Sequence, residues 1–584
     1  MIMTSPTRVP VPAPPSPTYQ IDDDQILVEQ LASARPSQEF DKAVQEDDLT
    51  SVATSRPQSA LDTYQPGRTE EKEDDQHPHE DEEREAKPTL PPPQATGWAP
   101  WSVVLGANLP AIPADKSTPV HQRISLKNPG SVAIGWNTYE EEKQPCIQYG
   151  TSANSLSQKT CSSSSITYPS SRTWANSVTL TGLNPATQYY YKIVSTNSTV
   201  VPFKTGRKAG DKTPFVANTV IDLGVYGEDG YTIKSPAEKR LIPYMSAAPD
   251  HSTISQLVKS INDYELVIHP GDLAYADDWF LKGHNLLDGK DAYEAILENF
   301  YDQLSPVSGQ RHYMLSPGNH EAACREVAYI PGTCPEGQFN FTDFNIRFGQ
   351  LMPTAFDSLS KNKTSIQSRQ KAKQLANPPF WFSFDYGMAH VVMIDTETDF
   401  QDAPDQPGGS ANLYGGPFGA PNQQLNFLEN DLASVDRSIT PWIILAGHRP
   451  WYSTGDSSNI CAPCQKAFEP LLYKYGVDLA VFGHVHNSQR FFPVYNGTAD
   501  PAGQNNPKAP MYIVAGGAGN IEGLSDVGSR QGYNAFAYAD DYSYASLSFL
   551  NVTHLQVNFI RSTDGSVLDS SILIKNHTNA FVVQ

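Results

Sequence analysis

Seven side chains of types that bind metal ions lie in five short blocks along the chain. They are Asp222, Asp272, Tyr275, Asn319, His448, His484 and His486. The apolar runs before the blocks, such as residues 442–445 and 478–482, are short, rich in β-branched or aromatic residues and followed by glycine, which is typical of buried strands. Because functional side chains gather in loops at strand ends, this arrangement predicts one metal site built from several loops.

The chemistry of these side chains divides them into two ligand sets. The first set consists of Asp222, Asp272, Tyr275 and His486. It offers three oxygens that are anionic or can lose a proton and one imidazole, a hard set suited to ferric iron. The second set consists of Asn319, His448 and His484. It is neutral and richer in nitrogen, so it suits a divalent ion such as zinc, ferrous iron or manganese, and the carboxylate of Asp272 can bridge the two ions.

Tyr275 is the most informative of the seven predicted ligands. A free phenol has a pKa of about 10 and binds metal poorly at neutral pH. A tyrosine ligand therefore implies an ion acidic enough to remove the phenol proton. His484 and His486 add a geometric indication, because residues two apart on an extended segment share one side and can both face a pair of ions.

The order of the five blocks resembles the signature of the purple acid phosphatases, a family of binuclear metallophosphoesterases, and the fungal members look most similar. That signature reads Asp-x-Gly, Gly-Asp-x-x-Tyr, Gly-Asn-His-Asp/Glu, Val-x-x-His and Gly-His-x-His, and all seven ligand positions are occupied here. The resemblance extends from about Pro119 to about Lys575. Leu445 replaces the valine of the fourth block, an apolar exchange that leaves His448 in place. Many plant members carry a His pair after this block to bind substrate, whereas residues 451–465 contain no His, so leaving-group recognition is not carried over.

The resemblance implies an acid phosphatase that hydrolyses phosphate monoesters, which are small-molecule substrates. Ferric iron and a second divalent ion (zinc, iron or manganese), roughly 3.5 Å apart, would clamp the phosphate oxygens, and a metal-activated hydroxide would attack phosphorus in line. His320, next to Asn319, would donate a proton to the leaving oxygen or hold the phosphate. Two alternatives stay open: a phosphodiesterase on the same metal cage, and a non-catalytic metal-loaded binding protein.

Other chemically active side chains near the blocks receive structural interpretations. His269 and Arg449 adjoin predicted ligands, and we expect them to support or pack against those ligands rather than bind metal. His312, Tyr542 and Tyr544 are interpreted as residues of the fold. None of the five is expected to be a ligand.

The chain is too long for a single core, and its patterns change along its length. Residues 1–97 combine Pro-rich tracts with an acidic run, which predicts a disordered tail, with an acidic binding tail as the alternative. Residues 98–210 show short alternating strands and a phrase, Leu180–Tyr191, that resembles the tyrosine corner of a fibronectin-type-III-like β-sandwich. Residues 211–505 alternate strands with helices, and residues 506–584 add closing strands. The predicted fold is therefore multidomain, with the sandwich followed by an α/β sandwich metallophosphoesterase domain that, by the resemblance, has two mixed sheets.

Charge is spread unevenly over the 584 residues. The formal net charge is -22, and residues 1–97 hold 20 Asp or Glu against 8 Lys or Arg, which accounts for -12 of it. The remainder is only mildly acidic, which argues against nucleic acid as a partner, because binding to the phosphate backbone needs a basic surface. No apolar run is long enough to span a bilayer, so no membrane span is expected.

The six cysteines indicate an oxidising compartment. They fall into three pairs that are close in sequence: Cys146 with Cys161, Cys324 with Cys334, and Cys461 with Cys464. None lies in a ligand block, so disulfides are favoured over zinc binding, although six cysteines allow 15 connectivities and the Cys461-Ala-Pro-Cys464 pair could be redox-active.

Six glycosylation sequons agree with a secreted, cell-wall or vacuolar glycoprotein. They begin at Asn197, Asn340, Asn362, Asn496, Asn551 and Asn576. The first residues contain no apolar stretch of the kind found in a signal peptide, so we expect a shifted start site or an unusual export route.

Overall fold

The computed structural model describes residues 107, 109–227, 252–281, 285, 289–322, 334–404, 420, 422–454 and 460–576. The tail predicted at residues 1–97 lies outside these residues. Within the part of the chain that is described, no helix is both long and apolar enough to cross a membrane.

The first folded segment is a sandwich of two antiparallel sheets. One side consists of β1 (Val120–Asn128), β2 (Ser131–Thr138), β6 (Trp174–Leu180) and β5 (Ser164–Ile166), and the other of β4 (Gln158–Cys161), β3 (Cys146–Gly150), β7 (Gln188–Ile193) and β8 (Val201–Lys204). The fully buried side chains of Trp136, Tyr191 and Phe203 belong to the core between them. The hydroxyl of Tyr189 accepts a hydrogen bond from the backbone N–H of Asn184 at 3.2 Å.

One side of this sandwich continues into the next part of the chain. Ile124 of β1 lies beside His312 of β11 in a parallel pairing, which joins β1 to a sheet of ten described strands. The sheet is completed by β9 (Phe215–Thr219), β10 (Leu266–Pro270), β11 (His312–Ser316), β21 (Ser543–Asn551), β22 (His554–Arg561) and β23 (Val567–Ile574). Its centre, β9, β10 and β11, is parallel, and β21 to β23 are antiparallel, so the sheet is mixed.

A second mixed sheet has seven described strands. In order, they are β12 (Phe382–Tyr386), β13 (Ala389–Met393), β14 (Trp442–Ala446), β15 (Leu479–Phe482), β19 (Met511–Ala515), β16 (Ser488–Phe491) and β20 (Asn534–Tyr538). The strands β13, β14, β15 and β19 are parallel. Every residue of β14 and β15 is buried, as their continuous apolar sequences predict. Side chains of both sheets belong to one hydrophobic core.

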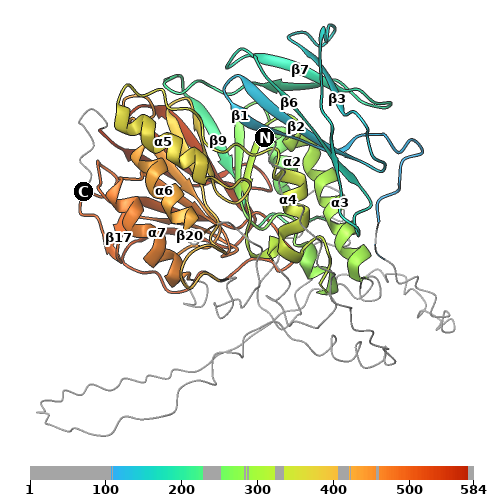
Figure 1. The fold of residues 1–584 in the computed structure, drawn as a ribbon. Helices are drawn as coiled ribbons and strands as arrows, with labels where there is room; N and C mark the ends of the chain where they lie inside the picture. The colour runs from blue at the N-terminus through green and yellow to red at the C-terminus, as the bar shows by residue number, and fades with distance from the viewer. Residues whose placement is uncertain are drawn as a thin grey trace, which may run out of the picture. The chain divides into compact units, whose positions relative to one another are not determined.

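Helices accompany both sheets. They are α2 (Ser252–Lys259), α3 (Gly289–Ser308), α4 (Thr342–Phe348), α5 (Lys363–Leu375), α6 (Gln423–Ala433) and α7 (Ala462–Lys474), with short 3₁₀ turns η2 (Ala276–Leu281), η4 (Asn319–Glu321) and η5 (Phe339–Phe341). Figure 1 shows α5, α6 and α7, in yellow to orange, beside the strands of the second sheet. A small ribbon of β17 (Val494–Tyr495) and β18 (Thr498–Ala499) follows β16.

Two of the three predicted disulfides are confirmed. Cys146–Cys161 joins paired residues of β3 and β4, and Cys461–Cys464 lies at the N-terminus of α7. Cys334 is disulfide-bonded, and its predicted partner, Cys324, lies outside the described residues.

Candidate metal centre

The seven predicted ligands come together from the ends of strands in both sheets. From the ten-stranded sheet, Asp222 follows β9, Asp272 and Tyr275 follow β10, and Asn319 follows β11. From the seven-stranded sheet, His448 follows β14, His484 follows β15 and His486 precedes β16. Because parallel strands end at the same edge of a sheet, the loops of the two sheets meet and face each other. The structure therefore brings these seven side chains from several loops close together.

The phenol of Tyr275 lies at the centre of the first ligand set. Its Oη is 3.0 Å from Asp222 Oδ1, 3.2 Å from Asp272 Oδ2 and 2.9 Å from His486 Nε2. All four side chains are almost completely buried. The set therefore converges on one small volume, as ligands of a single ion do.

The second ligand set forms around His448. Its Nε2 lies 2.9 Å from Asn319 Oδ1 and 3.0 Å from Asp272 Oδ2. Donor atoms of Asp272, His448 and His484 all lie within 4.8 Å of one another. The Oδ2 atom of Asp272 thus contacts both sets, which is the geometry that a bridging carboxylate requires.

The backbone at the site is strained. Asp222, Asp272, Tyr275 and His484 have φ values of 59°, 55°, 55° and 65°, in the left-handed region that few residues other than glycine adopt. Each such residue costs on the order of 1–3 kcal/mol and persists where the surrounding structure holds it for function. Four of the seven predicted ligands have this strained conformation. The strain indicates that the fold holds these side chains toward the site at a cost in backbone energy.

Two glycines let the loops approach the carboxylates. A Cβ atom at Gly318 would lie 2.3 Å from Asp272 Oδ1, and one at Gly483 would lie 2.4 Å from Asp222 Oδ2. Real Cβ contacts are never this short, so only glycine fits at either position. This explains why glycine stands directly before Asn319 and before His484.

Charges within the site alter one another strongly. Burial opposes the charged form of His448, but Asp272, Asp222 and Glu397 together outweigh burial and raise the pKa of His448 to about 9. Burial would also raise the pKa of Asp272, yet His448 and His320 hold it well below the usual value. Burial, with the carboxylates of Asp222 and Asp272, raises the pKa of Tyr275 far above that of a free phenol. The site therefore concentrates negative charge around a phenol.

His320 lies at the edge of the site and is oriented by a carboxylate. Its Nδ1 is 2.9 Å and 3.0 Å from the two oxygens of Asp277, and its backbone N–H donates to Asp272 Oδ1 at 3.0 Å. Its ring lies over that of Tyr275, with centroids 4.0 Å apart. Asp277, Asp278 and His320 also place three donor atoms within 4.8 Å of one another. Because Asp277 contacts Nδ1, the Nε2 atom is the ring nitrogen that can exchange a proton with a ligand.

Two supporting carboxylates were not identified from the sequence. Glu321 accepts hydrogen bonds from the backbone N–H groups of Asp272, Leu273 and Gly318, at 2.9, 2.7 and 2.9 Å, and so joins two ligand loops. Its place in the Gly-Asn-His-Asp/Glu block was a signal that could have found it. Glu397 is 2.9 and 2.8 Å from Nε of Arg449, and no motif marks it.

Arg449 and His269 have the supporting positions expected of them. The Nη1 atom of Arg449 lies 3.0 Å from His484 Nε2, so the guanidinium links Glu397 to a predicted ligand. His269 is buried, with its Nδ1 2.8 Å from the hydroxyl of Tyr313. Arg449 therefore contacts a predicted ligand of the second set, and His269 contacts a tyrosine that is not a predicted ligand.

The donor set fits a pair of ions. Oxygens of two carboxylates and a phenol, with one imidazole, surround one position, and an amide oxygen and imidazoles surround the other, with Asp272 shared. The first set is hard and the second softer, as two different metals require. The fold and the site define a metallophosphoesterase, and residues 248–488 match the family described as "Calcineurin-like phosphoesterase".

Comparisons with known proteins narrow the class. Residues 119–205 match "Purple acid Phosphatase, N-terminal domain", and residues 509–570 match "Iron/zinc purple acid phosphatase-like protein C". The chain is 60% identical over 488 residues to Acid phosphatase A of Cryphonectria parasitica, covering 83% of this chain and 97% of that protein. It is 32% identical over 503 residues to an acid phosphatase of Aspergillus ficuum, covering 68% and 75%. The chain belongs to the purple acid phosphatase family, and it is an enzyme with phosphatase activity.

A solved structure agrees with the fold. The purple acid phosphatase PPD1 of yellow lupin seeds matches with a TM-score of 0.54 at 21% identity, over 79% of this chain and 75% of that one. At this level of identity the match concerns the fold alone. It supports an N-terminal domain followed by a metallophosphoesterase domain with several sheets.

Proposed function

We propose that the protein hydrolyses phosphate monoesters at acidic pH with a ferric ion and a divalent ion. The first ligand set, with Tyr275, would hold ferric iron, and the second set would hold zinc, iron or manganese. The observation that carries the proposal is the carboxylate of Asp272, whose Oδ2 lies 3.2 Å from Tyr275 Oη and 3.0 Å from His448 Nε2 and so faces both sets.

When bound, the ions would supply positive charge for the phosphate oxygens and acidify a water molecule. The protein's own residues position the reaction. Glu321 fixes the loops of Asp272 and Asn319, so that the ligand geometry does not depend on the substrate. Asp277 holds the ring of His320 by Nδ1, so that Nε2 can donate a proton to the leaving oxygen.

Metal content and colour test this proposal. Purified protein should contain iron and a second metal, and charge transfer from Tyr275 to ferric iron should make it violet. Tyr275→Phe should bleach the colour while leaving much of the fold intact, since the change removes one oxygen. An active wild type that is colourless and free of iron would contradict the assignment.

Substrate class is tested with a matched pair of esters. We expect turnover of p-nitrophenyl phosphate and little turnover of bis(p-nitrophenyl) phosphate, because the proposed reaction is that of a monoesterase. Preference for the bis ester would indicate a phosphodiesterase on the same ligands. Ion binding without turnover of either ester would indicate a binding protein.

The N-terminal sandwich is proposed to be fibronectin-type-III-like and to serve as a scaffold. Its two-sheet arrangement and the hydrogen bond between Tyr189 and Asn184 support this. We propose domain boundaries at 98–210 for the sandwich, 211–505 for the catalytic domain and 506–584 for its closing strands.

A secreted, cell-wall or vacuolar location with N-linked glycans is also proposed. Five of the six sequon asparagines are exposed: Asn197, Asn362, Asn496, Asn551 and Asn576. Asn340 is half-buried and has a φ of 55°. Mass spectrometry of protein from its native source should find glycans at exposed sequons, whereas an unmodified chain would argue against export through a glycosylating compartment.

A further inference from the structure

The N-terminal sandwich meets helix α3 in part through buried polar side chains. From the sandwich, Tyr139 Oη donates to Glu298 Oε2 at 2.9 Å, and Tyr168 Oη lies 2.8 Å from Glu294 Oε2. Glu294 and Glu298 are each 1% exposed. Carboxyl groups at this depth need a counter-charge or a proton, because an isolated buried charge is costly.

The phenol of Tyr168 lies between two carboxyl groups. Its Oη is 2.8 Å from Glu294 Oε2 on α3 and 3.0 Å from Asp343 Oδ1 on α4. Gly337 leaves room for it, because a Cβ atom there would lie 2.8 Å from the Tyr168 hydroxyl. The three oxygens form a chain that joins the sandwich to two helices of the catalytic domain.

The number of protons on these three groups decides whether all of the hydrogen bonds between them can form. A phenol has one proton to donate, so it cannot satisfy two ionised carboxylates at once. If Glu294 is protonated, it donates to Tyr168 Oη, and Tyr168 donates to Asp343. The Oε1 atom of Glu294 then accepts from the Ser170 hydroxyl at 3.1 Å. In this protonation state every one of these groups has a partner.

Asp343 is the member of the pair that has a cation beside it. Arg347 Nε donates to Asp343 Oδ1 at 2.7 Å. Glu294, by contrast, has hydroxyls of Tyr168 and Ser170 as its hydrogen-bond donors. Burial, followed by the charge of Asp343, raises the pKa of Glu294 to about 8.

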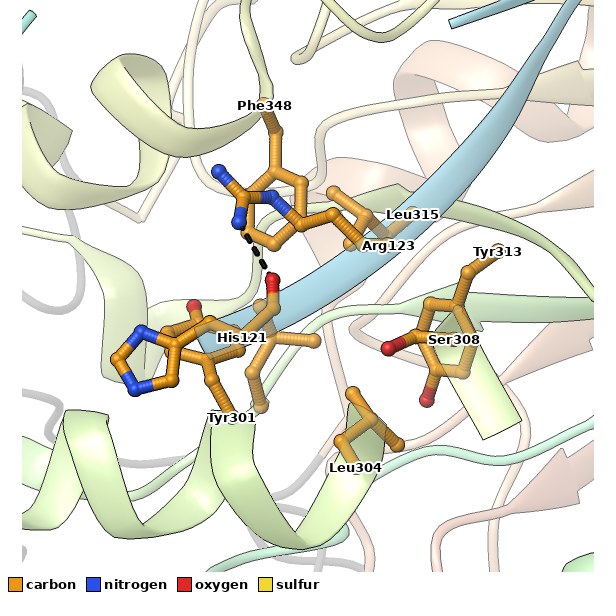
Figure 2. A pocket seen from close by; sticks show the side chains of 9 residues that line it. His121, Arg123, Tyr301, Leu304, Ser308, Tyr313, Leu315 and Phe348 are labelled. Carbon is orange, nitrogen blue, oxygen red and sulfur yellow. Dashed lines mark hydrogen bonds between the residues drawn. The ribbon is translucent and has the colours of Figure 1, made fainter. Parts of the chain in front are cut away.

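The charged and titratable groups that act on Glu294 come from three elements. They are Tyr168 before β6, Tyr293 on α3, and Asp343 and Arg347 on α4. Glu298 follows one turn later on α3, and His121 and Arg123 of β1 contact Arg347. Arg172 Nε lies 3.4 Å from Glu298 Oε1 and forms an ion pair with that carboxylate. Beside them lies a small cavity lined by Arg123, Tyr301 and Phe348, which Figure 2 shows with the Arg123 guanidinium turned to the carbonyl of His121. Arg347 contacts Asp343 and His121, and Arg123 donates to Asn137 and to the carbonyls of His121 and Arg347, so the hydrogen bonds of both arginines go to groups other than Glu294.

We propose that Tyr168, Glu294 and Asp343 form a pH-sensitive junction that holds the N-terminal sandwich on the catalytic domain in acid and loosens it as the pH approaches and passes neutrality. In acid, the proton on Glu294 completes the chain. When Glu294 loses its proton, two carboxylates compete for one phenol proton inside the protein. The proposal does not depend on the metal centre.

The sign of the effect follows from the raised pKa. The stabilisation is present in full below the ordinary glutamate value of 4.5 and is lost as the pH rises to about 8. One proton taken up on folding changes the unfolding equilibrium constant about tenfold per pH unit in this window. Wild type should therefore lose stability from pH 5 to pH 8.

Glu294→Gln is the decisive variant, because glutamine has the shape of a protonated glutamate. Its amide N–H₂ can donate to Tyr168 and its carbonyl can accept from Ser170. The free energy of unfolding is measured by denaturant titration at several pH values. Its slope with pH in this variant should correspond to about one proton fewer than in wild type. An unchanged slope would overturn the proposal.

Glu265→Gln provides a matched control. Glu265 also joins the sandwich to the catalytic domain, but it accepts from Lys204 at 2.9 Å and Arg207 at 2.7 Å. Burial opposes its charge, but these cations and Tyr386 lower the pKa of Glu265 to about 2. Glu265→Gln should therefore lower stability throughout pH 5 to 8 and keep the wild-type slope. A slope reduced as much as in Glu294→Gln would show that the effect is not specific to the junction.

Amide hydrogen exchange in wild type tests the junction without any variant. After correction for the intrinsic rate, residues 164–174 and 289–298 should lose protection between pH 5 and pH 8. The β3 and β4 strands, on the other sheet of the sandwich, should change less. Equal protection of residues 164–174 at both pH values would contradict the proposal.

Discussion

Two buried clusters in the catalytic domain contain similar residues but differ in structure. The metal centre holds Asp222 and Asp272 beside His448. The second, which we term the His390 cluster, consists of Arg369, Ser383, Asp385, His390 and Asp431. Each places two carboxylates around an imidazole inside the protein. The backbone that holds each cluster separates them.

The His390 cluster is neutralised by the protein's own side chains. The His390 ring lies between the carboxylates, with Nδ1 2.6 Å from Asp385 and Nε2 2.7 Å from Asp431. Ser383 donates to Asp431 at 2.7 Å, and Arg369 lies 3.5 Å from it. With His390 protonated, two negative charges meet two positive charges. The cluster is complete without a ligand.

The metal centre differs from the His390 cluster in its backbone. Its carboxylates surround a phenol, and several of its ligands have left-handed backbone, whereas the members of the His390 cluster lie on or beside regular elements, β12, β13, α5 and α6. Strain and glycine contacts are costs that a purely structural cluster does not require. The difference teaches that residue types alone do not distinguish the two clusters, whereas convergence of donors on a strained backbone does.

The largest expected effect comes from Asp272→Asn. The change removes charge from the one side chain shared by both ligand sets, so both ion occupancy and activity should fall. The loss of kcat/KM should exceed the about 10² to 10⁴ that a general acid contributes. Asp385→Asn in the His390 cluster should retain ions and turnover. Equal metal content in Asp272→Asn and wild type would argue against bridging.

His320→Ala should give the next largest effect. Proton donation matters most when the leaving alkoxide is a strong base, so alkyl phosphates should slow by about 10² to 10⁴ and p-nitrophenyl phosphate far less. Both metals should be retained. Uniform slowing would instead indicate phosphate positioning, and loss of metal would make His320 a ligand.

Removal of ions by a chelator should lower stability. Carboxylates that face each other at the metal centre would lose their counter-charge, and an ion at 1,000 times its dissociation constant stabilises by about 4 kcal/mol. Thermal unfolding with and without chelator measures this. The Asp272→Asn protein should show a much smaller shift, and an equal shift would place the stabilising ion elsewhere.

His390→Gln should cost about 3 kcal/mol in acid, because it leaves buried carboxylates with one cation fewer. Burial opposes the charge of His390, but Asp431 and Asp385 together outweigh burial and raise the pKa of His390. Its stabilisation is therefore present in full below about pH 6.5 and is lost as the pH rises through the folded value. The gap between variant and wild type, measured by denaturant unfolding, should narrow toward alkaline pH. A constant gap would indicate loss of packing alone.

Much of the catalytic site was predictable from the sequence because ligands follow short buried strands. Continuous apolar runs such as β14 and β15 can only be buried, and the loop after such a strand is where a polar side chain can face outward. Local pattern thus located the seven candidate ligands. The spacing of Cys146 and Cys161 similarly predicted a disulfide that the structure contains.

The supporting groups and the junction could not be predicted in this way. Glu397 contacts Arg449 from 52 positions away, and Tyr168 meets Glu294 across 126 positions. Neither pair belongs to a local pattern, because side-chain proximity at this separation depends on how the sheets and helices pack.

The sequence by itself determined the strands, the loops that follow them and the ligand types at their ends, since burial and turn formation are local properties of the chain. Only the tertiary structure decided that Asp272 faces both ligand sets and that a single phenol lies between Glu294 and Asp343. These outcomes depend on distances between segments far apart in sequence. The chemistry of a carboxylate is set by its neighbours, and its neighbours are set by the fold.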